Sequence, residues 1–148
     1  MNKTRMKISN ATFKDCVQIH RLASMPGLAN PEGKAPGLRW IKSFVLEKQY
    51  AYVIRDGSLV SAFLVGERTC GNLGMIWMIG VDERHRDKGF ATMLMEHAEA
   101  QMKAKGIRVI IAYGYTVNPL VKRLFERLKY RGGNTYTEYV KFLRDRED

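Results

Sequence analysis

One stretch of the chain, "VDERHRDKGFATML" at residues 81–94, combines residue types that could bind an anion. Six of the seven residues from Asp82 to Lys88 are formally charged, the seventh is His85, and Gly89 then precedes an apolar helical pattern. Backbone N–H groups in the first turn of a helix have no internal partners, and the helix dipole adds partial positive charge there. Because glycine leaves the backbone accessible, the stretch predicts a phosphate site, with basic side chains around it from Arg84, Arg86 and Lys88.

The stretch matches neither of the two common glycine-rich phosphate motifs. The pattern GxxxxGK[ST] of the P-loop is absent, and so is the GxGxxG spacing of the dinucleotide fold. The tripeptide "HRD" at 85–87 also occurs in kinase catalytic loops, but a chain of 148 residues is far too short for a kinase. The predicted phosphate site therefore depends on the helix start itself.

Composition narrows the class of protein. The net charge of +10 favours a polyanionic partner, either nucleic acid or a polyphosphate cofactor, although solubility alone also explains it. The 45% hydrophobic and 27% charged residues are typical of a globular protein, and the length favours one domain over residues 1–148. No apolar run approaches about 18 residues, so we expect no membrane partner.

Cysteine and histidine usage points away from disulfides and metals. Cys16 and Cys70 form no CxxC pair, which indicates free thiols in a reducing compartment. The first residues lack an apolar signal segment, so a cytoplasmic location is expected. The two cysteines and three histidines do not cluster, and no metal site is predicted.

Hydrophobic periodicity predicts alternating strands and helices. Strands are expected at 5–12, in a hairpin over 50–68 that turns at Asp56-Gly57, and at 73–81, 108–113 and 134–143. The 73–81 and 108–113 strands are apolar enough to be buried. Helices are expected after the first strand and at 38–48, 89–105 and 118–130. The loop at 24–37 is either a binding lid or a disordered connector. This order predicts a mixed sheet with helices on its faces.

The charged stretch and its surroundings resemble a known family. Val81, followed by Arg86-Asp87-Lys88-Gly89-Phe90-Ala91, resembles the Q/R-x-x-G-x-G/A signature of the GNAT superfamily of acetyl-CoA-dependent N-acetyltransferases. The segment with Asn118 and Leu124-Phe125-Glu126-Arg127-Leu128 resembles the N-x6-[Y]-E-x-L tail of that family. The resemblance implies an α/β (α+β) fold with a mixed, mostly antiparallel central sheet of six to seven strands and helices on both faces.

The resemblance also implies roles for individual residues. Acetyl-CoA would be the co-substrate, and its pyrophosphate would lie on the backbone amides from Arg86 to Thr92. The pantetheine arm would pair with Ile79 and Val81, on either side of Gly80, if the strand at 74–81 splays from the strand at 108–113. The amide of Val81 or a near neighbour would polarise the thioester carbonyl. Asn118 would bind the pantetheine arm or cap its helix, or do both. The loop at 24–37 and the helix after it would shape the acceptor site.

Three positions depart from the family pattern. Phe125 stands where the family usually has a tyrosine that protonates the leaving CoA thiolate, so Phe125 can pack beside the cofactor but cannot donate a proton. Tyr113 stands five residues before Asn118, where some members have a carboxylate base, and Met75 stands where others have a glutamate. The expected acid and both expected bases are therefore missing.

Three hypotheses follow from these departures. In the first, the activated thioester needs little acid–base help, and the acceptor is an amine of low pKa such as a protein N-terminus or a small α-amine. In the second, Tyr113, Tyr115 or Glu67 supplies the missing group. The third hypothesis is a catalytically weak module that binds acyl-CoA as a sensor. A nucleic-acid- or ribosome-binding protein is a weaker alternative, because no nucleic-acid motif is present. A homodimer is possible, as in many family members.

Overall fold

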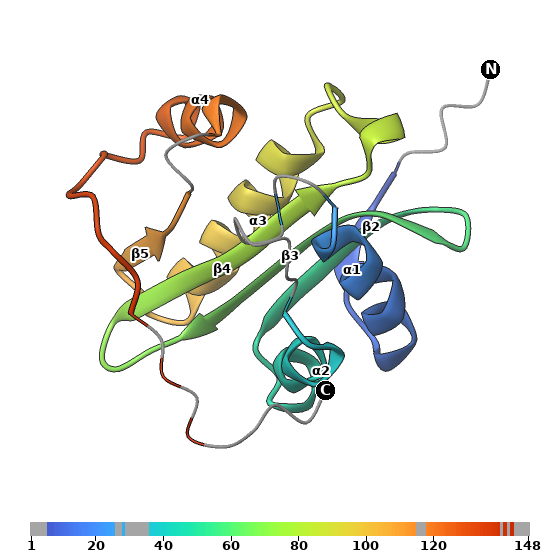
Figure 1. The fold of residues 1–148 in the computed structure, drawn as a ribbon, viewed down its shortest axis with the longest axis horizontal. Coiled ribbons are helices and arrows are strands. Elements are labelled where there is room, and N and C mark those ends of the chain that lie inside the picture. Colours follow the sequence, from blue (N-terminus) through green and yellow to red (C-terminus); the bar gives the residue numbers. More distant parts are fainter. Residues whose placement is uncertain are drawn as a thin grey trace.

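The computed structural model describes residues 6–25, 28, 36–114, 118–139, 141 and 143, and these residues build one sheet (Figure 1). The strands are β1 (Ile8–Asn10), β2 (Tyr50–Asp56), β3 (Leu59–Arg68), β4 (Leu73–Val81) and β5 (Val109–Ala112), and they lie side by side in that order. Neighbours from β1 to β4 are antiparallel, whereas β5 is parallel to β4. The predicted mixed, mostly antiparallel sheet is confirmed.

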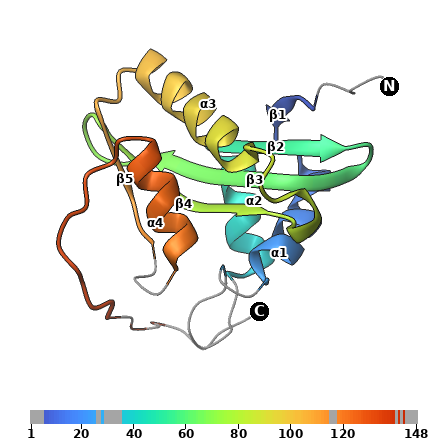
Figure 2. The same ribbon diagram turned by 90° about the horizontal axis from the view of Figure 1, so that it is seen from above.

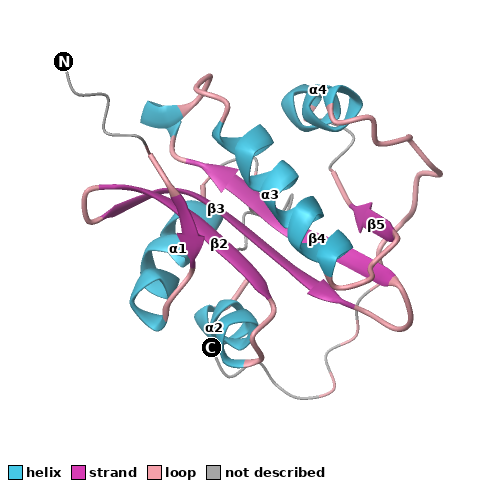
Figure 3. Cartoon of the chain, turned by 180° about the vertical axis from the view of Figure 1, so that it is seen from behind, coloured by secondary structure: helices cyan, strands magenta, loops and turns pink. Residues whose placement is uncertain are grey.

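Helices cover both faces of the sheet. In Figure 2, α3 (Phe90–Ala104) lies above the sheet, whereas α1 (Cys16–Ala23) and α2 (Leu38–Leu46) lie below it. Seen from behind in Figure 3, α3 runs along β4, and α4 (Pro119–Arg127) lies beyond β5. Two short 3-10 turns, η1 (Phe13–Asp15) and η2 (Glu83–His85), precede α1 and α3. Among the described residues, no helix is long and apolar enough to span a membrane.

Alternating side chains of the strands divide the core into two layers. On one face, Phe63 and Val65 of β3 pack with residues of α1 and α2. On the other face, Leu64 of β3 and Ile76 of β4 pack with α3 and with Leu124 of α4. The predicted four-residue repeat of α3 is buried as expected, with at most 6% exposure at Phe90, Leu94, Ala98 and Met102.

The sheet has five strands in the described part of the chain, so the expectation of six to seven strands is wrong. Residues 134–139 belong to no strand, and Tyr136 and Tyr139 are 73% and 92% exposed. Alternating side chains favour extended backbone, but a strand also needs a hydrogen-bonding neighbour, and this segment has none among the described residues. Val140 and Phe142, within the predicted 134–143 strand, lie outside the described residues.

The prediction that 108–113 is a buried strand is also wrong. It forms β5, but within the described part of the chain β5 pairs with β4 on one side alone, and Val109 is 56% exposed. An apolar run thus marks an edge strand here, partly covered by α4. Most of the 24–37 loop, residues 26–27 and 29–35, lies outside the described residues, so neither prediction for it is tested.

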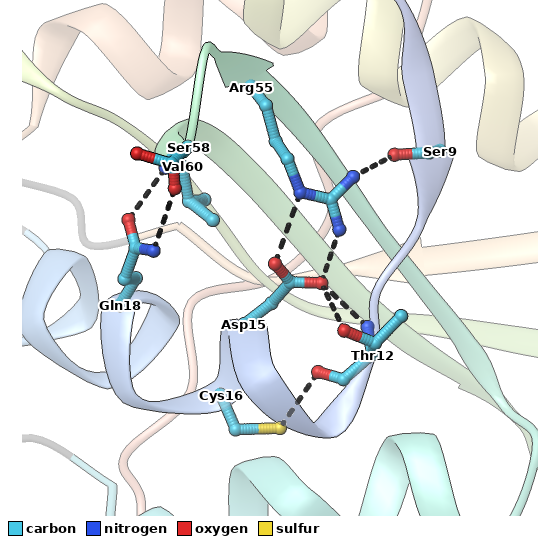
Figure 4. A network of polar contacts seen from close by, with 8 residues as sticks. All are labelled: Ser9, Thr12, Asp15, Cys16, Gln18, Arg55, Ser58 and Val60. Carbon is cyan, nitrogen blue, oxygen red and sulfur yellow. Dashed lines mark hydrogen bonds and ion pairs between the residues drawn. The ribbon is translucent and has the colours of Figure 1, made fainter.

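The predicted hairpin is present, and a polar network fixes α1 to its tip (Figure 4). Gly57 and Ser58 form its two-residue turn, one position beyond the predicted Asp56-Gly57 pair. Asp15 is 5% exposed and accepts hydrogen bonds from the Thr12 N–H and from the Arg55 guanidinium. These bonds outweigh burial, which raises the pKa of Asp15, and the net effect is a lowered pKa. The network holds α1 in place beneath β3.

Candidate active site

The splay between β4 and β5 creates an open strand edge. The two strands pair from Leu73 with Val109 to Ile76 with Ala112, and no pairing follows among the described residues. β4 continues for five further residues to Val81, still paired with β3 on its other side. The edge of β4 that faces away from β3 is therefore open from Trp77 onward in this part of the chain. This is the splay that the predicted pantetheine site requires.

The hydrogen bonds at the end of β4 show which groups face that edge. The Asp82 N–H donates to the carbonyl oxygen of Ser61 at 2.8 Å, so it points toward β3. In an antiparallel pair, successive residues direct their backbone polar groups to alternate sides. The N–H and C=O groups of Ile79 and Val81 therefore face the open edge, whereas those of Gly80 face β3.

Gly80 serves the packing of β4 instead. A Cβ at this position would lie 2.6 Å from both Leu28 Cδ1 and Phe63 Cε1. Gly80 therefore lets these two side chains close over the strand, and it contributes no N–H to the open edge.

A β-bulge marks the start of the open edge. Val65 pairs with Met78, and the next residue of β3, Gly66, pairs with Ile76, so Trp77 is the extra residue. Trp77 is 42% exposed, and its Nε1–H donates to Oε1 of Glu67 at 3.0 Å. Bulges often redirect side chains beside active sites. Sequence analysis did not identify Trp77, although a tryptophan in the middle of an apolar strand was a usable signal.

The turn after β4 is held by an ion pair. Asp82 is 8% exposed and accepts hydrogen bonds from the Arg84 N–H at 3.0 Å and from Nε and Nη2 of the same residue at 3.2 Å each. Hydrogen bonds from the Arg84 side chain and N–H lower the pKa of Asp82 from 3.8 to about 2. Arg84 is therefore committed to Asp82 and contributes less free charge to an anion than the sequence suggested.

His85 ties the same turn to the β2–β3 hairpin. Its Nε2 lies 3.2 Å from Oδ2 of Asp56, and its ring stacks on Phe90 at a centroid distance of 6.1 Å. The first contact links the turn to the end of β2, and the second links it to the first residue of α3. His85 is thus a structural part of the turn.

The residues that follow leave backbone amides available to a ligand. Asp87 and Gly89 have positive φ values of 61° and 79°, and α3 begins at Phe90. The first amide with a partner is that of Met93, which donates to the Gly89 carbonyl at 3.0 Å. Within the described residues, the N–H groups from Asp87 to Thr92 donate to no protein acceptor. The Arg86 N–H, which was also predicted to bind the pyrophosphate, donates instead to the Glu83 carbonyl at 3.5 Å. A Cβ at Gly89 would meet nothing within 4 Å, so the approach to these amides is open.

The electrostatics of this turn suit an anion. Arg86 and Lys88 are exposed beside the free amides, and the N-terminus of a 15-residue helix adds its dipole. A diphosphate can therefore be held by amides and flanking cations while its chain continues along the open edge at Val81 and Ile79. The donor set fits the pyrophosphate and the amide-bearing arm of a CoA thioester.

Asn118 caps α4, which was one of the two roles predicted for it, the other being a contact with the pantetheine arm. Its Oδ1 accepts hydrogen bonds from the N–H groups of Leu120 at 3.1 Å and Val121 at 3.4 Å. Phe125 packs against the α3-side core and lies 5.3 Å from the ring of Tyr130, whose hydroxyl donates to Glu99 at 3.0 Å. Any contact of Asn118 or Phe125 with a cofactor stays a prediction.

The structure describes two of the three predicted catalytic side chains, Tyr113 and Glu67, and no hydrogen bond joins these two. Tyr113 follows β5 and is 60% exposed. Glu67 lies on β3 beside the bulge. Tyr115 lies outside the described residues. Across the described part of the chain, no three histidine, cysteine, aspartate or glutamate residues gather as a metal site would require.

Sequence comparison defines the class of protein. Residues 15–130 match the model of the acetyltransferase (GNAT) family. The chain belongs to the GNAT family of acetyltransferases. No curated protein sequence matches it.

Solved structures share this fold. The ribosomal-protein-S18-alanine N-acetyltransferase from Escherichia coli has 16% identity and a TM-score of 0.73, over 86% of this chain and 79% of that one. A chain of the NatC complex bound to Gag peptide and CoA has 17% identity and a TM-score of 0.73, over 83% and 82%. The aminoglycoside acetyltransferase meta-AAC0020 from an uncultured soil metagenomic sample, in complex with sisomicin, has 15% identity and a TM-score of 0.74, over 94% and 97%.

Proposed function

We propose that this protein transfers an acetyl group from acetyl-CoA to a primary amine by direct attack of the amine on the thioester. The observation that carries the proposal is the continuity of two features. The open edge of β4 at Ile79 and Val81 leads into the free amides at the start of α3. This arrangement supports one ligand with an amide-bearing arm at one end and a diphosphate at the other, and acetyl-CoA has both.

The residues of the chain would bind and orient this ligand in sequence. The amides from Asp87 to Thr92, with Arg86 and Lys88, would hold the pyrophosphate. Ile79 and Val81 would pair with the arm, which places the thioester near the bulge at Trp77. A backbone N–H of β4 in this region would donate to the thioester oxygen and stabilise the charge that develops there. The amine nitrogen would then form the C–N bond, and the CoA thiolate would leave.

The proton balance favours an acceptor amine that is already partly neutral. Phe125 has no proton to give to the thiolate, and Met75 cannot act as a base. At pH 7 an α-amine is roughly 10–20% neutral, whereas a lysine ε-amine is roughly 0.04% neutral. We therefore propose a protein N-terminus or a small α-amine as the acceptor. Tyr113, Tyr115 and Glu67 remain the proposed groups that accept or donate protons.

Two structural relatives are named for the transfer of an acetyl group to amine-bearing acceptors. One is named for N-acetylation of the alanine of a ribosomal protein, and one acetylates aminoglycosides and was solved with sisomicin. Their names support an amine acceptor without choosing between a protein and a small molecule.

The missing acid and base favour one second candidate. A domain that binds acyl-CoA with little turnover would keep the open edge and the free amides while tolerating Phe125 and Met75. Such a sensor would bind acetyl-CoA and acetylate no amine at a useful rate.

Calorimetric titration of acetyl-CoA into the purified protein tests the shared premise of both candidates. We expect micromolar binding that Gly89→Glu abolishes, because the new carboxylate would stand at the free amides. Gly71→Glu is the matched control, since Gly71 also has a positive φ (68°) and open space around its Cα but lies in the β3–β4 turn. Absence of acetyl-CoA binding, with RNA bound instead, would contradict the proposal.

A peptide panel then separates the transferase from the sensor. We expect acetylation of α-amines in preference to lysine ε-amines of the same peptides. Preferential acetylation of ε-amines would refute the argument that the acceptor is chosen by the fraction of its amine that is neutral at pH 7. Binding without any acetylation would favour the sensor.

A further inference from the structure

Aromatic side chains of α2 lie beside the bulge of β4. The ring of Trp77 meets that of Trp40 on α2 edge to face, at a centroid distance of 6.3 Å, and Trp40 meets Phe44 in the same way at 4.7 Å. Phe44 is 4% exposed and belongs to the core, so the two tryptophans and Glu67 form what we call the aromatic–acidic patch. Trp77 is 42% exposed although it lies on a central strand, so it does not gain the full free energy of burying its side chain. Contact with a ligand would explain why a tryptophan stands at the bulge of β4.

Glu67 adds a fixed negative charge to the patch. The Trp77 Nε1–H holds its carboxylate through a 3.0 Å hydrogen bond. The neighbouring Arg68 does not neutralise it, because the Arg68 guanidinium donates to the carbonyls of Gly71 and Lys105. Among the described residues, no basic side chain lies within ion-pair distance of Glu67. The Glu67 carboxylate is therefore a local negative charge on a chain whose net charge is +10.

The patch lies where the open edge of β4 begins. Trp77 directly follows Ile76, the last residue of β4 that pairs with β5. Met78, the next residue, packs on the core between the sheet and the α1–α2 layer, so the bulge turns this part of β4 toward that face. The α1–α2 face of the bulge is therefore next to the position that the proposed function gives to the thioester.

We infer that the aromatic–acidic patch first binds the acceptor amine in its protonated form and disfavours amines that carry a neighbouring carboxylate. The amine must then lose this proton before it attacks the thioester, which a low amine pKa makes easier, as the proposed function requires. An ammonium group is attracted both by an indole face and by a carboxylate. A carboxylate next to the amine would instead be brought close to Glu67 and repelled. The substrate class is then peptide N-termini and simple amines rather than free amino acids. This inference depends on the proposed function for the location of the acceptor.

Tryptophan fluorescence measures this binding without any turnover. The chain has two tryptophans, and both belong to the patch, so a ligand bound there should change their emission. The probes are alaninamide and alanine, which share an α-amine and differ in the neighbouring carboxylate. We expect alaninamide to bind at least about fivefold more tightly, the size of one partly screened charge contact. Equal affinity for both probes would overturn the inference.

Variants assign the selectivity to Glu67. Glu67→Gln should bring the affinity ratio of the two probes close to one, mainly by weakening alaninamide. Glu96→Gln, on the exposed side of α3, is the matched control and should keep the wild-type ratio. A ratio that is unchanged in Glu67→Gln would also overturn the inference.

Turnover of the same probes with acetyl-CoA distinguishes this inference from the proposed function. Selective binding of alaninamide without acetylation would refute the transferase and leave the patch assignment intact. Acetylation with a Glu67-dependent ratio of kcat/KM supports both. If Glu67→Gln lowers turnover of both amines by the same factor and leaves their ratio unchanged, Glu67 acts on the proton instead, and the selectivity inference is wrong.

Discussion

Asp82 offers a direct test of how the turn between β4 and α3 is stabilised. Its carboxylate is 8% exposed and is held by Arg84 through one backbone and two side-chain hydrogen bonds. Asp82→Asn keeps the shape of the side chain and removes its charge. The expected loss of unfolding free energy therefore measures the charge-dependent part of these bonds.

The size of this loss follows from the pKa. A fall from 3.8 to about 2 corresponds to at most about 2.4 kcal/mol. The Arg84 side chain is 66% exposed, so solvent screens the pair, and we expect about 1–2 kcal/mol. Because folding lowers the pKa of this carboxylate, the stabilisation is complete above pH 3.8 and is lost as the pH falls through 2.

Urea denaturation at a series of pH values checks both the size and the sign. The difference between wild type and Asp82→Asn should be about 1–2 kcal/mol at pH 6 and should shrink steadily from pH 4 to pH 2. Glu83→Gln, an exposed neighbour in the same turn, is the control and should change stability by less than about 0.5 kcal/mol. A difference for Asp82→Asn that stays constant down to pH 2 would refute the assignment to charge.

Two further predictions concern the elements that support the site. Arg55→Met should lower the free energy of unfolding by about 2–4 kcal/mol in urea denaturation, because it leaves the Asp15 carboxylate buried without its cation. Lys122→Met is the control. It breaks an exposed pair with Glu126, whose Nζ–Oε1 distance is 3.9 Å, and should cost less than about 1 kcal/mol. Equal effects would contradict the structural role of the Asp15–Arg55 pair. Asn118→Ala should cost about 1 kcal/mol by removing the cap of α4, and Asn118→Asp should restore stability. If Asn118→Asp also keeps wild-type affinity for acetyl-CoA in calorimetry, then Asn118 acts as a cap alone.

Local sequence signals predicted most of the elements that build the site. The four-residue repeat from Phe90 to Met102 specified α3 and its buried face, and Gly89 marked its start. Asn118 followed by Pro119 specified the start of α4. These signals succeed because capping, periodicity and turn geometry depend on residues that are close in sequence.

The failures concern features that depend on distant partners. The alternating pattern at 134–143 predicted a sixth strand, but pairing needs a neighbouring edge that no local pattern encodes. The apolar run of β5 suggested burial, whereas its edge position exposes Val109. Trp77 and Glu67 meet because a bulge shifts the register between β3 and β4. Register arises from the whole sheet, so sequence analysis could propose Glu67 without identifying the tryptophan that orients it.

The four-residue pairing between β4 and β5 has a consequence for local opening of the fold. Parallel pairing is slightly less stable per residue than antiparallel pairing, and among the described residues it is the sole sheet contact of β5. β5 and the helix that follows it are therefore expected to exchange their amide hydrogens through openings that leave β2 and β3 protected. A ligand bound along the edge of β4 beyond Ile76 would lie beside the place where β4 and β5 separate and would slow this exchange. Binding at the edge of β4 should therefore be detectable as slower amide hydrogen exchange in β5.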